Sequence, residues 1–170
     1  MNRRPLLIAV LLLALLPGLA SADDPPVIEH QPVPCTVAAK TISLCAAISD
    51  DQNVSAARLY FRRAGEEFYS FVDMIFGGLN YCGTLPAPRE GKLKVIEYYV
   101  QAVDDAFQTQ RTSTFQLQVL SEGQCEFPPL EKDQKRAAAI KVFGTNKKQA
   151  PRLDEAFDRT GVTYIPLGGK

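Results

Sequence analysis

Apolar and polar residues alternate in short runs from Pro25 to Leu120. A period of two is typical of β-strands that bury one face, and polar turn residues, for example those at 50–53, separate the runs. In the runs 54–62 and 96–102, for instance, Leu59 and Val100 are expected to point inward. The pattern predicts seven strands, near residues 27–34, 42–48, 54–62, 68–74, 81–85, 96–102 and 115–119.

Seven short strands within about 95 residues are the spacing expected of a β-sandwich. No helical pattern of 10–15 residues lies between them, which argues against a parallel α/β sheet. We therefore predict an all-β fold, with strands packed in two layers around a single core.

Two segments, AAISDDQNVSAARLYFRR and LKVIEYYVQAVDDAFQTQ, resemble bacterial immunoglobulin-like and fibronectin type III-like domains. The first has an Asp-rich turn before a Val-x-x-apolar-x-apolar strand, and the second has Tyr98, Val100 and Ala102 in a Tyr-x-Val-x-Ala pattern. The resemblance covers about residues 25–120 and implies a seven-strand immunoglobulin-like sandwich, without indicating a function. The chain has no Trp, so we expect Leu59 to fill the space of the buried Trp of antibody domains.

The first 22 residues have the order of a secretory signal peptide. Arg3 and Arg4 precede an apolar run over 6–16, Pro17-Gly18 follows it, and Ala20-Ser21-Ala22 is a small-x-small cleavage sequence. The apolar run is shorter than the roughly 20 residues of a spanning helix, although an uncleaved anchor is the alternative. We predict cleavage before Asp23, a periplasmic or extracellular protein, and no membrane span in the mature chain.

The mature chain divides by composition into a sandwich at 23–125 and a small C-terminal extension at 126–170. The extension holds nine basic and six acidic side chains, against eight and thirteen in the sandwich. Residues 130–139 could form a helix, 153–157 a helical turn, and 140–143 and 162–165 strands. Whether the extension folds as an appended unit or orders only on a partner stays open at this point.

Charge and motifs bear on the class of function. Without residues 1–22, 17 basic side chains face 19 acidic ones, so no broad positive field is available for nucleic acid. The single histidine, His30, lies in an edge segment, and no Gly-x-Ser-x-Gly or phosphate-binding loop occurs. We expect His30 to be structural and the protein not to be an enzyme, with a small hydrolase as the minor alternative.

Four cysteines in an exported chain predict two disulfides, and sequence alone allows three pairings. In the immunoglobulin-like fold that the resemblance implies, the second and fifth strands are antiparallel neighbours, and the first and last strands are often parallel neighbours. The resemblance therefore favours Cys45–Cys82 and Cys35–Cys125. The alternative is Cys35–Cys45 with Cys82–Cys125, which needs a shifted register between the first two strands.

Two groups of outward residues are candidate binding sites. Asp50, Asp51, Asp104 and Asp105 belong to loops expected at one end of the sandwich, where they could bind Ca²⁺, although Asp is also a common turn residue. No other cofactor is expected.

Tyr60, Tyr69, Phe71 and Tyr99 fall on outward positions of one predicted sheet and could form a binding face. A register error of one residue, or an extension folded over them, would remove this face. The prediction is a non-catalytic binding or spacer module of the cell envelope with a protein partner. A carbohydrate-binding accessory module is the alternative, which the lack of Trp disfavours.

Overall fold

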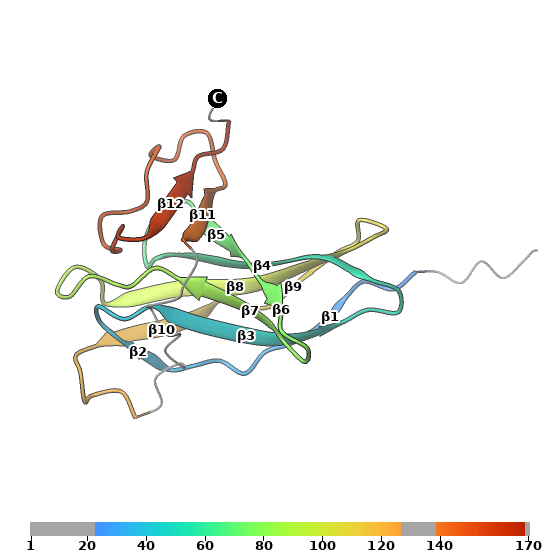
Figure 1. Cartoon of the computed structure of the whole chain (residues 1–170), viewed down its shortest axis with the longest axis horizontal. Coiled ribbons are helices and arrows are strands. Elements are labelled where there is room, and N and C mark those ends of the chain that lie inside the picture. The colour runs from blue at the N-terminus through green and yellow to red at the C-terminus, as the bar shows by residue number, and fades with distance from the viewer. Residues whose placement is uncertain (1–22, 127–138, 169–170) are drawn as a thin grey trace, which may run out of the picture.

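The computed structural model describes residues 23–126 and 139–168, which form a sandwich of two β-sheets (Figure 1). The predicted signal peptide at 1–22 and most of the helix considered for 130–139 lie outside these residues. The strands are β1 (Val27–Glu29), β2 (Cys35–Val37), β3 (Ile42–Ser49), β4 (Val54–Arg63), β5 (Ser70–Asp73), β6 (Ile75–Phe76), β7 (Tyr81–Leu85), β8 (Val95–Asp104), β9 (Thr109–Arg111), β10 (Phe115–Leu120), β11 (Ile140–Gly144) and β12 (Val162–Ile165).

One sheet has four strands in the order β1-β3-β7-β6, and the other has eight, in the order β12-β11-β5-β4-β8-β10-β2 with β9 beside β8. The described part contains no helix, and so no helix that could span a membrane. All seven predicted strands are present, and the all-β sandwich prediction is confirmed.

The first predicted strand is divided between the two sheets. Its beginning, β1, pairs antiparallel with β3, whereas its end, β2, pairs parallel with β10. Pro32 and Pro34 lie between the two parts, where a missing N–H and a fixed φ prevent a continuous ladder.

The core lies between the sheets, and the predicted alternation places its residues correctly. Leu59, Phe61, Ile96, Tyr98 and Val100 are at most 1% exposed. Leu59 is part of this cluster. The predicted register is therefore right on both central strands, β4 and β8, which pair antiparallel along most of their length.

Both predicted disulfides are present, and the alternative pairing is excluded. Cys45 and Cys82 are directly opposite each other on β3 and β7, with 4.1 Å between their Cα atoms. Cys35 on β2 and Cys125, beyond β10, are joined across a Cα–Cα distance of 5.8 Å. The parallel pairing of β2 with β10 brings this second pair together.

The described part of the C-terminal extension continues the large sheet. β11 pairs antiparallel with β5, and β12 pairs parallel with β11. Val142, Leu153 and Phe157 from this segment are at most 3% exposed and belong to the main core cluster. Residues 153–157 form a turn rather than a helix, with the N–H of Phe157 bonded to the carbonyl of Asp154. Residues 139–168 thus pack on the sandwich itself.

Candidate functional site

The outward face of the large sheet carries a row of aromatic rings. Tyr60 on β4 is directly opposite Phe71 on β5 and Tyr99 on β8. Its ring centroid lies 5.2 Å from that of Phe71 and 4.7 Å from that of Tyr99, with which it is stacked. Tyr69 contacts Tyr99 edge to face at 5.0 Å. The structure therefore brings together all four predicted aromatic residues, on the face that the alternation predicted.

The C-terminal segment lengthens this row. Phe143 on β11 is opposite Phe71, and their rings stack with a centroid distance of 4.9 Å. Ile165 on β12 is opposite Phe143 and is 38% exposed. Phe143 was not predicted as a site residue, because nothing in its local pattern indicates that β11 pairs with β5. We call Tyr60, Tyr69, Phe71, Tyr99 and Phe143 the aromatic stripe.

Three arginines lie over rings of the stripe. The guanidinium carbons of Arg62, Arg58 and Arg111 are 4.2, 4.7 and 5.2 Å from the ring centroids of Tyr69, Phe71 and Tyr99, respectively. Such cation–π contacts are attractive and leave the guanidinium edge available for hydrogen bonds.

The arginines are themselves held by neighbouring acids. Arg62 pairs with Glu97 at 2.7 Å, in a position where both side chains are mostly buried. Arg58 lies 3.6 Å from Asp73. Burial raises the pKa of Tyr99, and the nearby Tyr60 adds to this effect, while Arg111 opposes it. The stripe is thus a half-buried, preorganised surface of flat rings and fixed charges.

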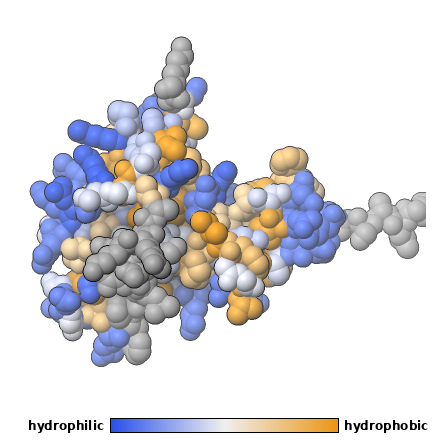
Figure 2. Space-filling model, viewed as in Figure 1, coloured by the Kyte–Doolittle hydropathy of each residue, from blue (hydrophilic) through white to orange (hydrophobic). Residues whose placement is uncertain are grey.

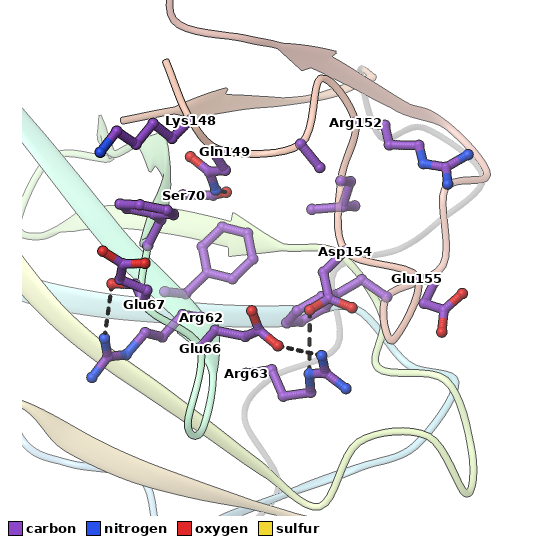
Figure 3. Close-up of a pocket in the computed structure, with 15 residues that line it drawn as sticks. Arg62, Arg63, Glu66, Glu67, Ser70, Lys148, Gln149, Arg152, Asp154 and Glu155 are labelled. Carbon is purple, nitrogen blue, oxygen red and sulfur yellow. Dashed lines mark hydrogen bonds and ion pairs between the residues drawn. The ribbon is translucent and has the colours of Figure 1, made fainter. Parts of the chain in front are cut away.

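A cavity of about 470 Å³ separates the β4–β5 hairpin from the segment 148–157 (Figure 3). Phe61 and Phe157, whose rings meet edge to face at 5.2 Å, are among its lining residues. Arg63 bridges Glu66 and Asp154, and both acids raise its pKa. Because these charged groups already pair across the cavity, they join the C-terminal segment to the hairpin.

The predicted calcium ligands are distributed over two neighbouring places. Carboxylate oxygens of Asp50 and Asp51 lie within 4.8 Å of each other and of an oxygen of Asp23, which the sequence analysis did not include. Gln52 donates from its side chain to Asp23 at 2.8 Å and from its backbone to Asp50 at 3.0 Å. Partial desolvation and the carboxylates of Asp23 and Asp50 raise the pKa of Asp51.

Asp104 and Asp105 do not join this group of three. Asp104 is fully buried and accepts a hydrogen bond from the backbone N–H of Gln108 at 2.7 Å. Asp105 is exposed and contacts the side-chain amide of Asn53 at 3.5 Å. Calcium binding by the four predicted residues remains a prediction.

His30 connects the two sheets. Its Nδ1 donates to the backbone carbonyl of Cys45 at 2.8 Å, and its Nε2 accepts from the Tyr98 hydroxyl at 3.0 Å. The backbone N–H of Val33 reaches the same hydroxyl at 3.4 Å. Since a carbonyl can only accept, this network requires the tautomer with the proton on Nδ1. Both ring nitrogens are therefore hydrogen-bonded, one to each sheet.

Comparisons with known proteins add little to this geometry. No family model matches the chain, and no curated protein does. An engineered protein of known structure is 14% identical, with a TM-score of 0.43; the match covers 58% of this chain and 21% of that one. The SrpA adhesin from Streptococcus sanguinis and a point mutant of it are each 16% identical, with TM-scores of 0.39. Those two matches cover 61% and 59% of this chain, and only about three fifths of either adhesin chain.

Proposed function

We propose that this chain is an exported, non-catalytic binding module of the immunoglobulin-like or fibronectin type III-like class. Its partner is a protein of the cell envelope, which it recognises through the aromatic stripe. The order of features in residues 1–22 supports export, and two disulfides are compatible with an oxidising compartment.

The observation that carries the proposal is the composition of the outward face of the large sheet. Four aromatic rings lie in register across β11, β5, β4 and β8, and three arginines are stacked on rings of the stripe. Tyrosine and arginine, together with tryptophan, are enriched among the residues that contribute most binding energy at protein interfaces. Rings held by their neighbours also lose little conformational entropy on binding.

A carbohydrate ligand fits this surface less well. A sugar ring stacks on an open aromatic face, whereas arginines cover faces of Tyr69, Phe71 and Tyr99. The carbohydrate alternative predicts that an insoluble polysaccharide binds the wild-type chain but not a variant with Tyr60 and Tyr99 replaced.

Photo-crosslinking in envelope extract tests the protein partner. A photoreactive phenylalanine analogue in place of Tyr60 should capture one defined protein, whereas the same analogue at Phe107 should not. Phe107 is 87% exposed and belongs to the β8–β9 turn, so it is a matched exposed control. The captured protein, once purified, should bind the Tyr60→Leu/Tyr99→Leu double variant at least tenfold more weakly. Equal affinity would refute the role of the stripe.

Export has an independent test. Mass spectrometry of the protein recovered outside the cytoplasm should give a chain that begins at Asp23. A chain that retains residues 1–19 would instead identify the N-terminal segment as an anchor.

A further inference from the structure

Among the described residues, the β6–β7 hairpin carries the most exposed group of large apolar side chains. Ile75, Phe76 and Leu79 are 73%, 55% and 88% exposed, although Met74, just before them, is 6% exposed. Figure 2 shows hydrophobic surface gathered over β6 and the tip of this hairpin. The side chains therefore change from buried at Met74 to exposed at Ile75, yet they remain apolar.

The hairpin also lacks the residues that protect natural strand edges. No Asp, Glu, Lys or Arg occurs from residue 74 to residue 88, and no proline occurs before Pro86. Exposed edge strands are ordinarily blunted by charges, prolines or bulges, because an open edge pairs with other chains. By contrast, β1 contains Glu29, with Pro32 soon after it. β6 has neither a charge nor a proline, and its short length of two residues is the one blunting device it has.

The backbone of β6 is open on one side and well supported on the other. β6 is the last strand of the four-stranded sheet, with Ile75 opposite Cys82 and Phe76 opposite Tyr81. The N–H of Met74 donates to the carbonyl of Ala57 at 2.8 Å, and that of Gly77 donates to Asn80 at 2.8 Å. Both ends of the strand are thus fixed. An antiparallel edge strand directs alternate residues' N–H and C=O groups away from its partner. Because Gly77 is bonded to Asn80, the outward groups of β6 are those of Phe76, and these are where another strand can pair.

The hairpin turn exposes its apolar tip. Gly78 has a φ of 97°, a left-handed value that suits the first central position of a tight hairpin turn. Leu79 follows it at the tip, where a polar residue is usual, and is almost fully exposed. The tip therefore extends the apolar surface of β6 rather than ending it.

We propose that β6 accepts an extended, uncharged segment of a partner protein as an added strand of the four-stranded sheet. Such a segment supplies backbone groups for the open edge and apolar side chains for both faces of the strand. Its lack of charge matches the uncharged run at 74–88. This interaction is separate from the aromatic stripe, which lies on the other sheet, and goes beyond the proposed function.

Two other occupants fit less well. A lipid surface would cover the apolar side chains but would leave the open backbone groups of β6 without hydrogen-bond partners. A second copy of this chain would have to form a stable interface, which needs about 800 Å² on each partner. Three partly exposed side chains, at roughly 150 Å² each, fall well short of that area.

The test uses the full disulfide-bonded chain and a random decapeptide phage library as the probe. Selected peptides should be uncharged, with apolar residues at neighbouring positions so that both faces of the added strand are apolar. As free peptides, they should bind Phe76→Lys and Ile75→Thr at least tenfold more weakly than wild type. Ile75→Thr keeps a β-branched side chain, so it preserves strand propensity while removing apolar surface. The control variant Phe107→Lys should bind the same peptides with the affinity of the wild-type chain.

A test of the backbone hydrogen bonds distinguishes strand addition from binding by apolar side chains alone. N-methylation of alternate peptide amides should abolish binding, and the bound peptide should slow hydrogen exchange in β6. Binding that survives N-methylation, binding that is equal in the β6 variants, or a library with no β6-dependent binder would each overturn the proposal.

Two further measurements identify the rejected occupants. If the chain cosediments with phosphatidylethanolamine–phosphatidylglycerol vesicles and Phe76→Lys abolishes this binding, the hairpin binds lipid and the proposal is wrong. If sedimentation velocity shows a dimer and Phe76→Lys abolishes it, the hairpin mediates self-association and the proposal is wrong. The Tyr60→Leu/Tyr99→Leu variant should retain peptide binding, so failure of the stripe and failure of the β6 edge are distinguishable.

Discussion

The aromatic stripe and the β6–β7 hairpin are both outward apolar surfaces, but they are built in opposite ways. Each ring of the stripe contacts another ring, and Tyr69, Phe71 and Tyr99 also have an arginine over them. In the hairpin, the ring of Phe76 contacts only that of Tyr81, and Ile75 and Leu79 are 73% and 88% exposed. The stripe therefore stabilises the fold as well as presenting a surface, whereas the hairpin adds little to stability.

Loss of the Cys45–Cys82 disulfide should have the largest effect on the free energy of unfolding. It should destabilise the hairpin more than the stripe. The bridge closes a sequence separation of 37 residues and joins β3 to β7, on which β6 rests. In the chain-entropy model its removal in Cys45→Ala/Cys82→Ala costs roughly 3–4 kcal/mol. Urea unfolding measures the loss, and hydrogen exchange should accelerate more at 75–85 than at 58–62. Equal acceleration in both segments would mean that the bridge supports the whole sandwich.

Alanine at the centre of each surface compares the two directly. Tyr60→Ala removes contacts with Phe71 and Tyr99 and should lower the free energy of unfolding by about 2 kcal/mol, less than a fully buried aromatic. Phe76→Ala removes one ring contact, with Tyr81, and should lower it by no more than about 1 kcal/mol. Chemical unfolding at neutral pH measures both. Similar losses would contradict the division between a supported and an unsupported surface.

Arg62 tests how much the stacked arginines contribute. Arg62→Ala removes both the contact with Tyr69 and the ion pair with Glu97, and should cost about 1 kcal/mol. Arg62→Lys, which keeps the charge but not the planar group, should recover only part of this loss. A double-mutant cycle with Tyr69→Leu isolates the stacking contact, and a coupling energy of zero would show that Arg62 acts only through its bonds to Glu97 and to the Glu67 carbonyl.

The stripe should also respond to alkaline pH. Burial raises the pKa of Tyr99 above its ordinary value near 10. The protonated form is thus favoured by folding, and its contribution is complete below about pH 10 and is lost as the pH rises through the folded-state pKa. Tyr99→Phe should lose less stability than wild type above about pH 10, as measured by thermal unfolding across that range. Parallel curves would contradict this.

The smallest effect on stability is expected at the hairpin tip. Leu79→Asn places a common turn residue at an exposed position and should alter the free energy of unfolding by less than about 0.5 kcal/mol. It should nevertheless reduce binding of a hydrophobic dye to the folded chain. A loss above 1 kcal/mol would show that Leu79 packs more firmly than its exposure indicates.

The sequence by itself determined the faces of the strands. Because successive side chains of a strand point to opposite faces, the alternation around Leu59 and Val100 was enough to place them in the core and Tyr60 and Tyr99 outside it. Together with the immunoglobulin-like resemblance, this register also predicted both disulfides correctly.

Which strands lie beside one another was decided only by the tertiary structure. The pairing of β11 with β5 brings Phe143 to the stripe, and the position of Asp23 beside Asp50 follows from long-range packing. The exposed edge at Ile75 likewise depends on β6 being the last strand of its sheet. Alternation is a local property of the backbone, whereas these contacts join residues from 27 to 72 positions apart, and a period of two contains no information about the neighbour that a strand will take.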